Sequence, residues 1–394
     1  MGCTQPGASR PRCRAARPSP CRQRGHDHRR HQPVPHLCRR GCRSLAGTAG
    51  ARPYLDPHLS LFTQLAAPRA SGQRGWLGAT GGGPVILDVI LFHAPLLLAA
   101  LILDAIFGEP RAIWSRVPHP AVLMGRLVDW ADDRFNIGEH PRATGVAVTL
   151  GLSVLAIGIG VILALLPLGW LWQILVAAIL LAQRSLSDHV LAVADALRGS
   201  TEQGRQMVAM IVGRDTTAMD AADISRAAIE SAAENLSDGV VAPAFWFLIA
   251  GLPGLIFYKM INTADSMIGH RTPRHEDFGW AAARLDDLLN WLPARLTAVL
   301  IASTHRGSRA WAVIRADAHK HRSPNAGWPE AAMAGVLDVA LSGPRSYDGT
   351  VRDYPFVHAR GARSPGAIDI EAAAEVLWRA WVILAAVVAI LWIL

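Results

Sequence analysis

The sequence predicts an all-α, polytopic integral membrane protein with amphipathic helices and long polar loops on the cytoplasmic side. Several apolar runs reach the roughly 20 helical residues that a bilayer crossing takes. No region shows the clear alternation of apolar and polar residues that is typical of a half-buried strand. Between the apolar runs lie polar stretches that are rich in charged side chains.

Residues 1–84 differ in composition from the rest of the 394-residue chain. They hold 14 arginines, no lysine, two aspartates and no glutamate, and all five cysteines lie within the first 42 residues. Since the whole chain carries +8, the remainder is mildly acidic, which argues against nucleic-acid binding. We expect a disordered basic N-terminal extension. The abrupt change at Pro84 also raises the hypothesis of a misassigned start, with the natural chain beginning near Val85.

The apolar runs define a membrane domain over residues 85–394. The first run, 85–107, is almost entirely Leu, Ile, Val and Ala. The second, 144–166, is followed by a shorter run, 170–182, and the two form either a helical hairpin or one broken helix. The fourth, 240–258, contains two prolines, so we expect kinks there.

Two further runs complete this set. Run 288–302 includes Arg295, and because an arginine inside a bilayer is costly, this run is a candidate interfacial helix. Run 377–394 carries three tryptophans that suit membrane interfaces. Arginines are dense in the polar stretches 184–238, 259–287 and 305–376. These stretches can share one side of the membrane only if at least one of the weaker runs is re-entrant or interfacial.

The segment 216–239 predicts an amphipathic helix with an acidic stripe. At 100° per residue, the charged side chains fall within an arc of roughly 120°, and Gly239 is a natural stop. The simplest interpretation is a solvated face. Two points favour a site instead: acids four residues apart repel each other, and negative charge near a helix C-terminus is disfavoured. The stripe consists of Asp220, Asp223, Arg226, Glu230, Glu234 and Asp238.

Two further polar segments are candidates for chemistry. Segment 258–279 holds Lys259, one of only two lysines in the chain, together with side chains that suit metal or phosphate; the alternative is a solvated loop. The charged group Arg284, Asp286 and Asp287 follows it, and is as readily a structural salt-bridge network as a site. Segment 319–349 is long, polar and rich in Pro and Gly, which is typical of a functional loop.

Common catalytic signatures are absent. The sequence contains no phosphate-binding G-x-x-x-x-G-K-[ST] loop, no G-x-S-x-G elbow and no H-E-x-x-H pair. The residues alone therefore indicate a membrane protein with acid-rich polar segments, and no more.

Taken together, the polar segments resemble the CobD/CbiB family of cobalamin biosynthesis, the adenosylcobinamide-phosphate synthases. The resemblance covers the chain from about residue 86 to its end, in the family's order. Its carriers are LDAIFGEPRAIWSRVPHPAVLMGRL, GRDTT, ESAAENLSDGVVAPAFW, YKMINTADSMIGHR, AARLDDLLNWLPARL and SPNAGWPEAAMAGVLDVALSGPRSYDG.

The resemblance implies a ligase that forms an amide bond in cobalamin (vitamin B12) assembly. Adenosylcobyric acid would be joined to (R)-1-amino-2-propanol or its O-phosphate, giving adenosylcobinamide or its phosphate. ATP and Mg²⁺ are the expected cofactors. The implied location is the cell (inner) membrane, with the polar segments cytoplasmic because ATP is used there. Membrane lipid and other late cobalamin-pathway enzymes are the expected partners.

Residue type and placement then suggest roles. Candidate metal ligands are Glu230, Glu234 and Asp238, with Asp265 as a further choice, and a candidate base is His270 or His119. Candidate catalytic residues are Glu230, Glu234, Asp265, His270 and Lys259. Candidate substrate or phosphate contacts are Arg214, Asp215, Asn235, Asp238, Asn262, Ser266, Arg271, Asn325, Trp328 and Tyr347.

Two other classes of function stay open. One is a non-catalytic corrinoid-binding membrane scaffold, and the other is a transporter subunit. Acids placed mid-span favour transport, whereas in this sequence the acids are expected to lie beside the apolar runs.

Overall fold

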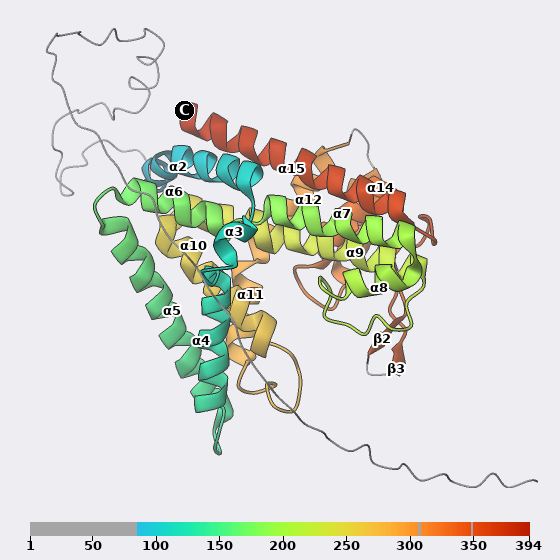
Figure 1. Cartoon of the computed structure of the whole chain (residues 1–394), viewed down its shortest axis with the longest axis horizontal. Coiled ribbons are helices and arrows are strands. Elements are labelled where there is room, and N and C mark those ends of the chain that lie inside the picture. Colours follow the sequence, from blue (N-terminus) through green and yellow to red (C-terminus); the bar gives the residue numbers. More distant parts are fainter. Residues whose placement is uncertain (1–84, 306–308, 348–349) are drawn as a thin grey trace, which may run out of the picture. The chain divides into compact units, whose positions relative to one another are not determined.

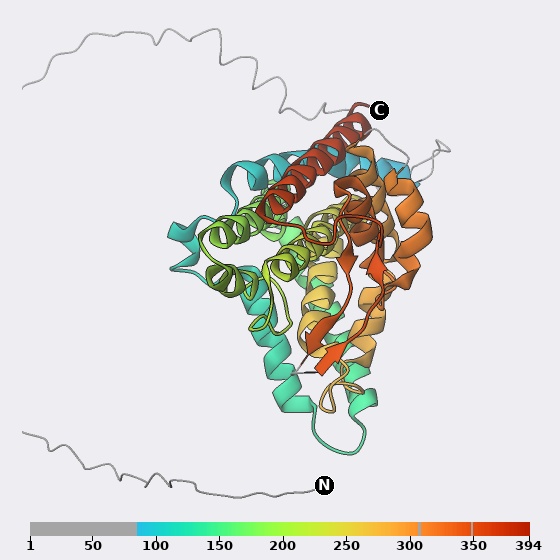
Figure 2. The ribbon, with the colours of Figure 1, turned by 90° about the vertical axis from the view of Figure 1, so that its right-hand side faces the viewer.

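The computed structural model describes residues 85–305, 309–347 and 350–394. The predictions for residues 1–84 lie outside the described residues. Most of the described chain is helical, and two small antiparallel β-pairs are its only strands (Figures 1 and 2). The all-α class predicted from the sequence is confirmed.

One group of long helices lies side by side in Figure 1. Buried aliphatic side chains from α7, α9 and α15 belong to one core, and those from α2 and α6 to a second. The short helix α8 (Thr201–Val208) joins α7 to α9. The members of this group are α2 (Val85–Phe107), α6 (Gly169–Leu180), α7 (Gln183–Gly199), α9 (Ala221–Leu236) and α15 (Ala367–Ile393).

A second group surrounds the C-terminal half of α10 (Ala242–Ile268) and slants away from the first in Figure 1. Glycines of α5 bring backbones into contact. A Cβ on Gly160 would lie 2.4 Å from the Cα of Pro253, and one on Gly145 would lie 1.9 Å from the carbonyl oxygen of Phe278. The other members are α4 (Pro120–Phe135), α5 (Pro141–Leu165) and α11 (Trp280–Leu289), with the short α3 (Arg111–Trp114) before α4.

Helix α10 is broken at Gly251, where φ is +60°. Only glycine adopts this conformation at little cost. The imidazole of His93 donates to the carbonyl of Leu248 at 3.2 Å, so a carbonyl released by the break has a partner. The kink predicted in run 240–258 is therefore confirmed at Gly251, two residues before Pro253, and the helix continues ten residues beyond the run.

The prediction that the helix stops at Gly239 is wrong. A π-helical turn, η2 (Ser237–Val241), carries α9 directly into α10. The amide of Ala182, in the gap between α6 and α7, donates to the carbonyl of Gly239 at 3.1 Å. Tertiary contact therefore holds the glycine inside a continuous helical segment, and π-turns of this kind often occur at functional sites.

The C-terminal third packs beside α9. Strand β1 pairs antiparallel with β4, placing Leu341 opposite Val357, and β2 pairs antiparallel with β3. The elements are α12 (Trp291–Ser303), α13 (Arg309–Asp317), η3 (Ala318–Lys320), α14 (Gly327–Leu337), β1 (Leu341–Ser342), β2 (Arg345–Tyr347), β3 (Thr350–Arg352) and β4 (Phe356–Val357).

Five helical segments among the described residues are long and apolar enough to cross a membrane. Large apolar side chains on α5, such as Val154 and Leu165, are exposed, as lipid contact requires. The chain is thus a multi-pass membrane protein. Runs 144–166 and 170–182 form two separate helices, α5 and α6. Helix α15 begins ten residues before the predicted 377–394. The five segments are Leu87–Phe107, Pro141–Leu165, Gly169–Gly199, Ala221–Ile268 and Ala367–Ile393.

Candidate functional site

The acidic stripe on α9 divides into parts with different surroundings. At the N-terminus, Asp220 and Asp223 form a capping box, in which each side chain accepts from the other residue's backbone N–H. This is a structural use of two acids, because the first N–H groups of a helix have no partner within it. Of the remaining stripe residues, Asp238 belongs to one polar site and Glu230 to another.

The first site is a closed set of hydrogen bonds that we call the polar ring: Asp238, Tyr258, Asn262, Asp286 and Asn290. The amide nitrogen of Asn262 lies 3.5 Å from a carboxylate oxygen of Asp238 and 3.3 Å from one of Asp286. The Asn290 amide donates to the other oxygen of Asp286 at 3.0 Å. The Tyr258 hydroxyl donates to Asn290 at 2.9 Å and lies 3.3 Å from the carbonyl of Asp238.

Four elements position the polar ring. The π-turn η2 supplies Asp238, the C-terminal half of α10 supplies Tyr258 and Asn262, and α11 supplies Asp286. Asn290 lies between α11 and α12 and is buried with Asp286. Because the break at Gly251 folds α10 back, residues 20 to 24 apart in sequence meet across the ring.

Lys259 lies within the electrostatic reach of Asp238, Asp286 and Glu109. Asp265 lies six residues further along α10 and interacts with Asp287 and Glu234. Several carboxylates therefore surround one lysine. Asp238 and Asp265 both belong to the long helical segment Ala221–Ile268 and flank its apolar run 240–258, as the sequence predicts.

Burial raises the pKa of Asp286 to about 7, with a further contribution from the negative charge of Asp265. Burial also raises the pKa of Asp287, although Arg284 and Arg271 oppose this effect. A carboxyl group that titrates near neutral pH can accept a proton at the pH of the cell. The polar ring thus contains a candidate general base that the sequence did not single out.

The second site lies toward the N-terminus of α9, eight residues from Asp238. The carboxylate of Glu230 accepts from the Arg214 guanidinium at 3.0 Å and from the backbone N–H of Ser342 at 2.6 Å. Glu230 thereby holds together two loops that are far apart in sequence. Between these loops is a cavity that we call the arginine hollow, lined by Arg214, Asp215, Ala218, Met219, Asp223, Arg226, Ser342 and Pro344.

Asn325 and Trp328 lie at a third place, against α11 and α12. The Asn325 amide donates to the carbonyl of Asp287 at 2.8 Å. The Arg295 guanidinium stacks between two indoles, 4.3 Å from the ring centre of Trp291 and 4.5 Å from that of Trp328. Asn325 therefore supports the end of the helix that carries Asp286.

The structure separates the other predicted residues. Asn235 and Ser266 hydrogen-bond within their own helices, and His270 is exposed. His119 caps α4 by accepting from the N–H of Ala121, and its other ring nitrogen donates to the carbonyl of Ile179. This structural use of both nitrogens argues against His119 as a base. The side chain of Tyr347 lies outside the described residues.

The described part of the chain brings no three His, Cys, Asp or Glu side chains together in a way that could hold a metal ion. The predicted ligands Glu230, Glu234 and Asp238 are among the side chains it leaves apart. A pair of carboxylates remains, because Asp238 and Asp286 share the amide of Asn262. Mg²⁺ that is bound to phosphates commonly takes one or two protein carboxylates, and this pair fits that use.

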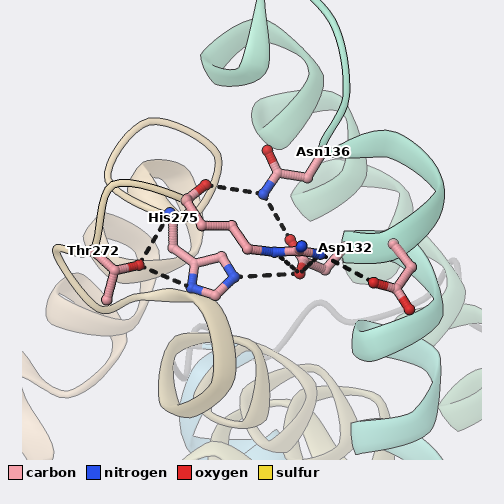
Figure 3. A network of polar contacts seen from close by, with 6 residues as sticks. Asp132, Asn136, Thr272 and His275 are labelled. Atoms are coloured by element: carbon pink, nitrogen blue, oxygen red, sulfur yellow. Dashed lines mark hydrogen bonds and ion pairs between the residues drawn. The ribbon is translucent and has the colours of Figure 1, made fainter.

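The loop 269–279, which joins α10 to α11, is held to α4 by the network in Figure 3. The carboxylate of Asp132 accepts from the Arg274 guanidinium at 2.6 and 2.9 Å, and lies 3.3 Å from the His275 ring nitrogen. Asn136 donates both to Asp132 and to the carbonyl of Arg274. Burial would raise the pKa of Asp132, but these hydrogen bonds hold it below its usual value.

Sequence reasoning missed Asp286, Asn290 and Tyr258 as site residues. The segment AARLDDLLNW contained the signal, since Asp286 and Asn290 are four residues apart and share a helix face. It was ambiguous because a salt-bridge network predicts the same residue types. Only the contact with Asn262 on the folded-back half of α10 shows that Asp286, rather than Asp287, joins the polar ring.

Comparison with known proteins gives one family. The family model described as CobD/Cbib protein matches residues 97–377. The cobalamin biosynthesis protein CobD of Brucella suis biovar 1 is 48% identical over 300 residues, covering 72% of this chain and 92% of that protein. The protein of the same name from Sinorhizobium fredii is 48% identical over 312 residues, covering 75% and 96%. That from Rhodobacter capsulatus is 46% identical over 314 residues, covering 76% and 98%. No solved structure matches the chain.

Proposed function

The chain belongs to the CobD/CbiB family, and on that premise we propose that it is an amide-forming ligase of cobalamin biosynthesis. The acid substrate is adenosylcobyric acid, and the amine is (R)-1-amino-2-propanol or its O-phosphate. The product is adenosylcobinamide or its phosphate.

The observation that carries the proposal is the buried carboxyl of Asp286, which titrates at about 7 beside Lys259. Amide formation releases a proton from the attacking amine, so it requires a base that is partly ionised near neutral pH. It also requires positive charge to offset the oxygens of the activated carboxylate. In this proposal, Asp286 accepts the amine proton and Lys259 supplies the positive charge.

ATP with Mg²⁺, when bound, would supply the phosphoryl group that activates the carboxylate as an acyl phosphate. Asp238 is the carboxylate of the polar ring that would hold the metal, and the Asn262 amide lies beside it, while Asp286 is kept for the amine proton. Arg271 stands close to Asp287 at the same end of α10 and is proposed to contact phosphate. Asn325 orients the α11 end through the carbonyl of Asp287.

The proposed location is the cell inner membrane, with the three polar stretches on the cytoplasmic side where ATP is available. Five apolar helical segments support a multi-pass arrangement. Late enzymes of the same pathway are proposed partners, since they act on the product of this reaction.

The test uses the full chain in detergent with adenosylcobyric acid, ATP, Mg²⁺ and each amine. Mass spectrometry should detect the amide. Asp286→Asn removes the proton acceptor while keeping shape, so turnover should fall by about a hundred-fold or more. Asp265→Ala removes a negative charge that helps to raise the pKa of Asp286, so the pH at which turnover rises should move downward. Asp188→Asn, at an exposed ion pair on α7, is the matched control and should keep wild-type rates.

Transport is a second candidate, because Asp238 and Asp265 flank the apolar run of one segment that is long enough to cross a membrane. A transporter would move adenosylcobyric acid across proteoliposomes and release no amide. A scaffold would bind the corrinoid, move none and release no amide. Either outcome would overturn the ligase proposal.

A further inference from the structure

The arginine hollow is a built cavity rather than a gap between loops. Glu230 holds its two walls, bonding Arg214 on one side and the backbone of Ser342 on the other. Both charged side chains are largely buried, with 7% of Glu230 and 11% of Arg214 exposed. The space between the walls is about 70 Å³ and opens to solvent. That volume suits one small polar group rather than a whole drug-sized ligand.

The wall of the arginine hollow that contains Ser342 has an unfavourable backbone conformation. Ser342 has φ of +60°, which costs a residue other than glycine on the order of 1–3 kcal/mol. Gly343 follows with φ of +87°, and a Cβ on this residue would lie 2.5 Å from the Phe356 ring. Such conformations cluster at binding sites, because the surrounding structure must hold them in place.

The lining offers both hydrogen-bond donors and acceptors. Among the described residues, the five N–H groups of the Arg214 guanidinium make one hydrogen bond, to Glu230. Asp215 uses one carboxylate oxygen twice, for the N–H and the hydroxyl of Thr217, and its other oxygen has no partner in the described chain. The Thr217 hydrogen bonds hold the pKa of Asp215 below its usual range, so that oxygen is an acceptor only.

The charges of the lining balance. The described lining holds two arginines and two aspartates, with Arg226 paired to Asp223 and Arg214 paired to Glu230. A phosphate would bring further negative charge against these carboxylates, which costs binding energy. An uncharged group that accepts through one atom and donates through another fits both halves of the lining. The primary carboxamide is such a group.

We propose that the arginine hollow binds a primary carboxamide side arm of the corrinoid substrate. Its carbonyl accepts from Arg214 or Arg226, and its NH₂ donates to the free oxygen of Asp215. Glu230 on α9 and Asp238 on η2 are eight residues apart in one continuous helical segment, which is about 12 Å along a helix. The hollow therefore anchors one edge of the ligand while the polar ring meets the reacting carboxylate. The inference rests on the proposed function, because that supplies an amide-bearing corrinoid.

The test is equilibrium dialysis of the full chain in detergent against two probes. One is adenosylcobyric acid, and the other is the corresponding corrinoid with carboxylates in place of all amides. The wild type should prefer the amide form. Asp215→Asn keeps the turn at Thr217 but presents an NH₂ group, so it should bind the amide form about ten-fold more weakly and lose the preference. Asp195→Asn, exposed on α7, should bind like the wild type.

A second variant fills the space without changing charge. Ala218 is exposed in the lining, so Ala218→Phe should reduce binding of the amide form and leave ATP binding unchanged. Tighter binding of inorganic phosphate by Asp215→Asn would overturn the proposal in favour of a phosphate site. Unchanged affinity and preference in both variants would overturn it as well. If the wild type binds neither corrinoid, the proposed function itself fails, and the two failures are thereby distinguished.

Discussion

At the scale of single residues, burial decides what each carboxyl group of this chain does. Asp286 and Asp287 are neighbours in sequence, yet only Asp286 is buried within hydrogen bonds from two asparagines. Glu230 and Glu234 share one side of α9, yet Glu230 is buried against Arg214 and Glu234 is exposed. The sequence cannot separate such pairs, because residue type and helical spacing are the same for both members.

Asp286 predicts a specific dependence on pH. With a pKa of about 7 in the folded chain, its ionised form increases as pH rises through 7, so turnover should rise with it. The turnover of Asp286→Asn should not show this rise through pH 7. Rates measured from pH 5.5 to 8.5 check this, and an unchanged profile in the variant would remove Asp286 as the base.

The same pKa predicts an opposite trend in stability. An unfolded aspartate titrates at about 3.9, so between about pH 4 and 7 the folded chain binds more protons than the unfolded one. The free energy of unfolding should therefore fall as pH rises through that window. Asp286→Asn should weaken this dependence in thermal unfolding.

Glu230 is predicted to matter for stability as well as for function. Glu230→Ala leaves the Arg214 guanidinium buried without its partner, which costs about 3–5 kcal/mol. The midpoint of thermal unfolding in detergent should fall accordingly. The control is Glu202→Ala, which removes an exposed ion pair on α8 and should change stability by about 0.5 kcal/mol or less. An unchanged midpoint with lost turnover would return Glu230 to the catalytic role suggested by the sequence.

At the scale of elements, two irregularities in one helical segment create the polar ring. The π-turn η2 carries Asp238, and the break at Gly251 folds the rest of α10 back toward it. The sequence predicted a kink near Pro253 and did not predict the fold-back. The reason is that proline signals a lost hydrogen bond, whereas the direction of the turn depends on packing against α5.

The contact between α5 and α10 predicts a difference between two glycines on the same helix. Gly160→Ala would place a Cβ 2.4 Å from Pro253 and force the helices apart, at a cost of about 1–3 kcal/mol. Nothing lies within 4 Å of a Cβ at Gly158, so Gly158→Ala should be neutral or slightly stabilising. Thermal unfolding of both variants checks this, and equal midpoints would contradict the packing.

The network in Figure 3 predicts local order in the loop 269–279. Asp132→Asn removes the charge that holds Arg274, so amide hydrogen exchange in the loop should increase. Asp133→Asn is the control, because that side chain is 72% exposed and makes one contact with the same arginine. The pKa of Asp132 is lowered, so its stabilisation is present above the unfolded value of about 3.9 and lost as pH falls through the folded value. Equal exchange in both variants would show that the charge of Asp132 does not order the loop 269–279.

At the scale of the whole molecule, the arrangement in the membrane is testable by thiol labelling. After the five native cysteines are replaced by serine, single cysteines at exposed Glu202, Glu276 and Asp353 report on the three polar stretches. All three should resist an impermeant reagent in intact spheroplasts and react after disruption. Labelling of any one in intact cells would place that stretch outside the cytoplasm.

The sequence by itself determined the helical membrane class, the multi-pass character and the family. These properties depend on the length and composition of apolar runs and on short motifs, both of which are local in the chain. It also predicted Arg214, Asp238, Lys259 and Asn262 as site residues, and their roles stay predictions.

Only the tertiary structure decided how those residues are grouped. It joined Asp238 and Asn262 to Asp286, and placed Glu230 with Arg214 and Ser342 in a second site. The physical reason is that hydrogen bonding and burial depend on contacts between residues 16 to 112 positions apart. Those contacts follow from a glycine break and a π-turn: the prolines signalled a kink, but packing sets the direction of the break and the position of the π-turn.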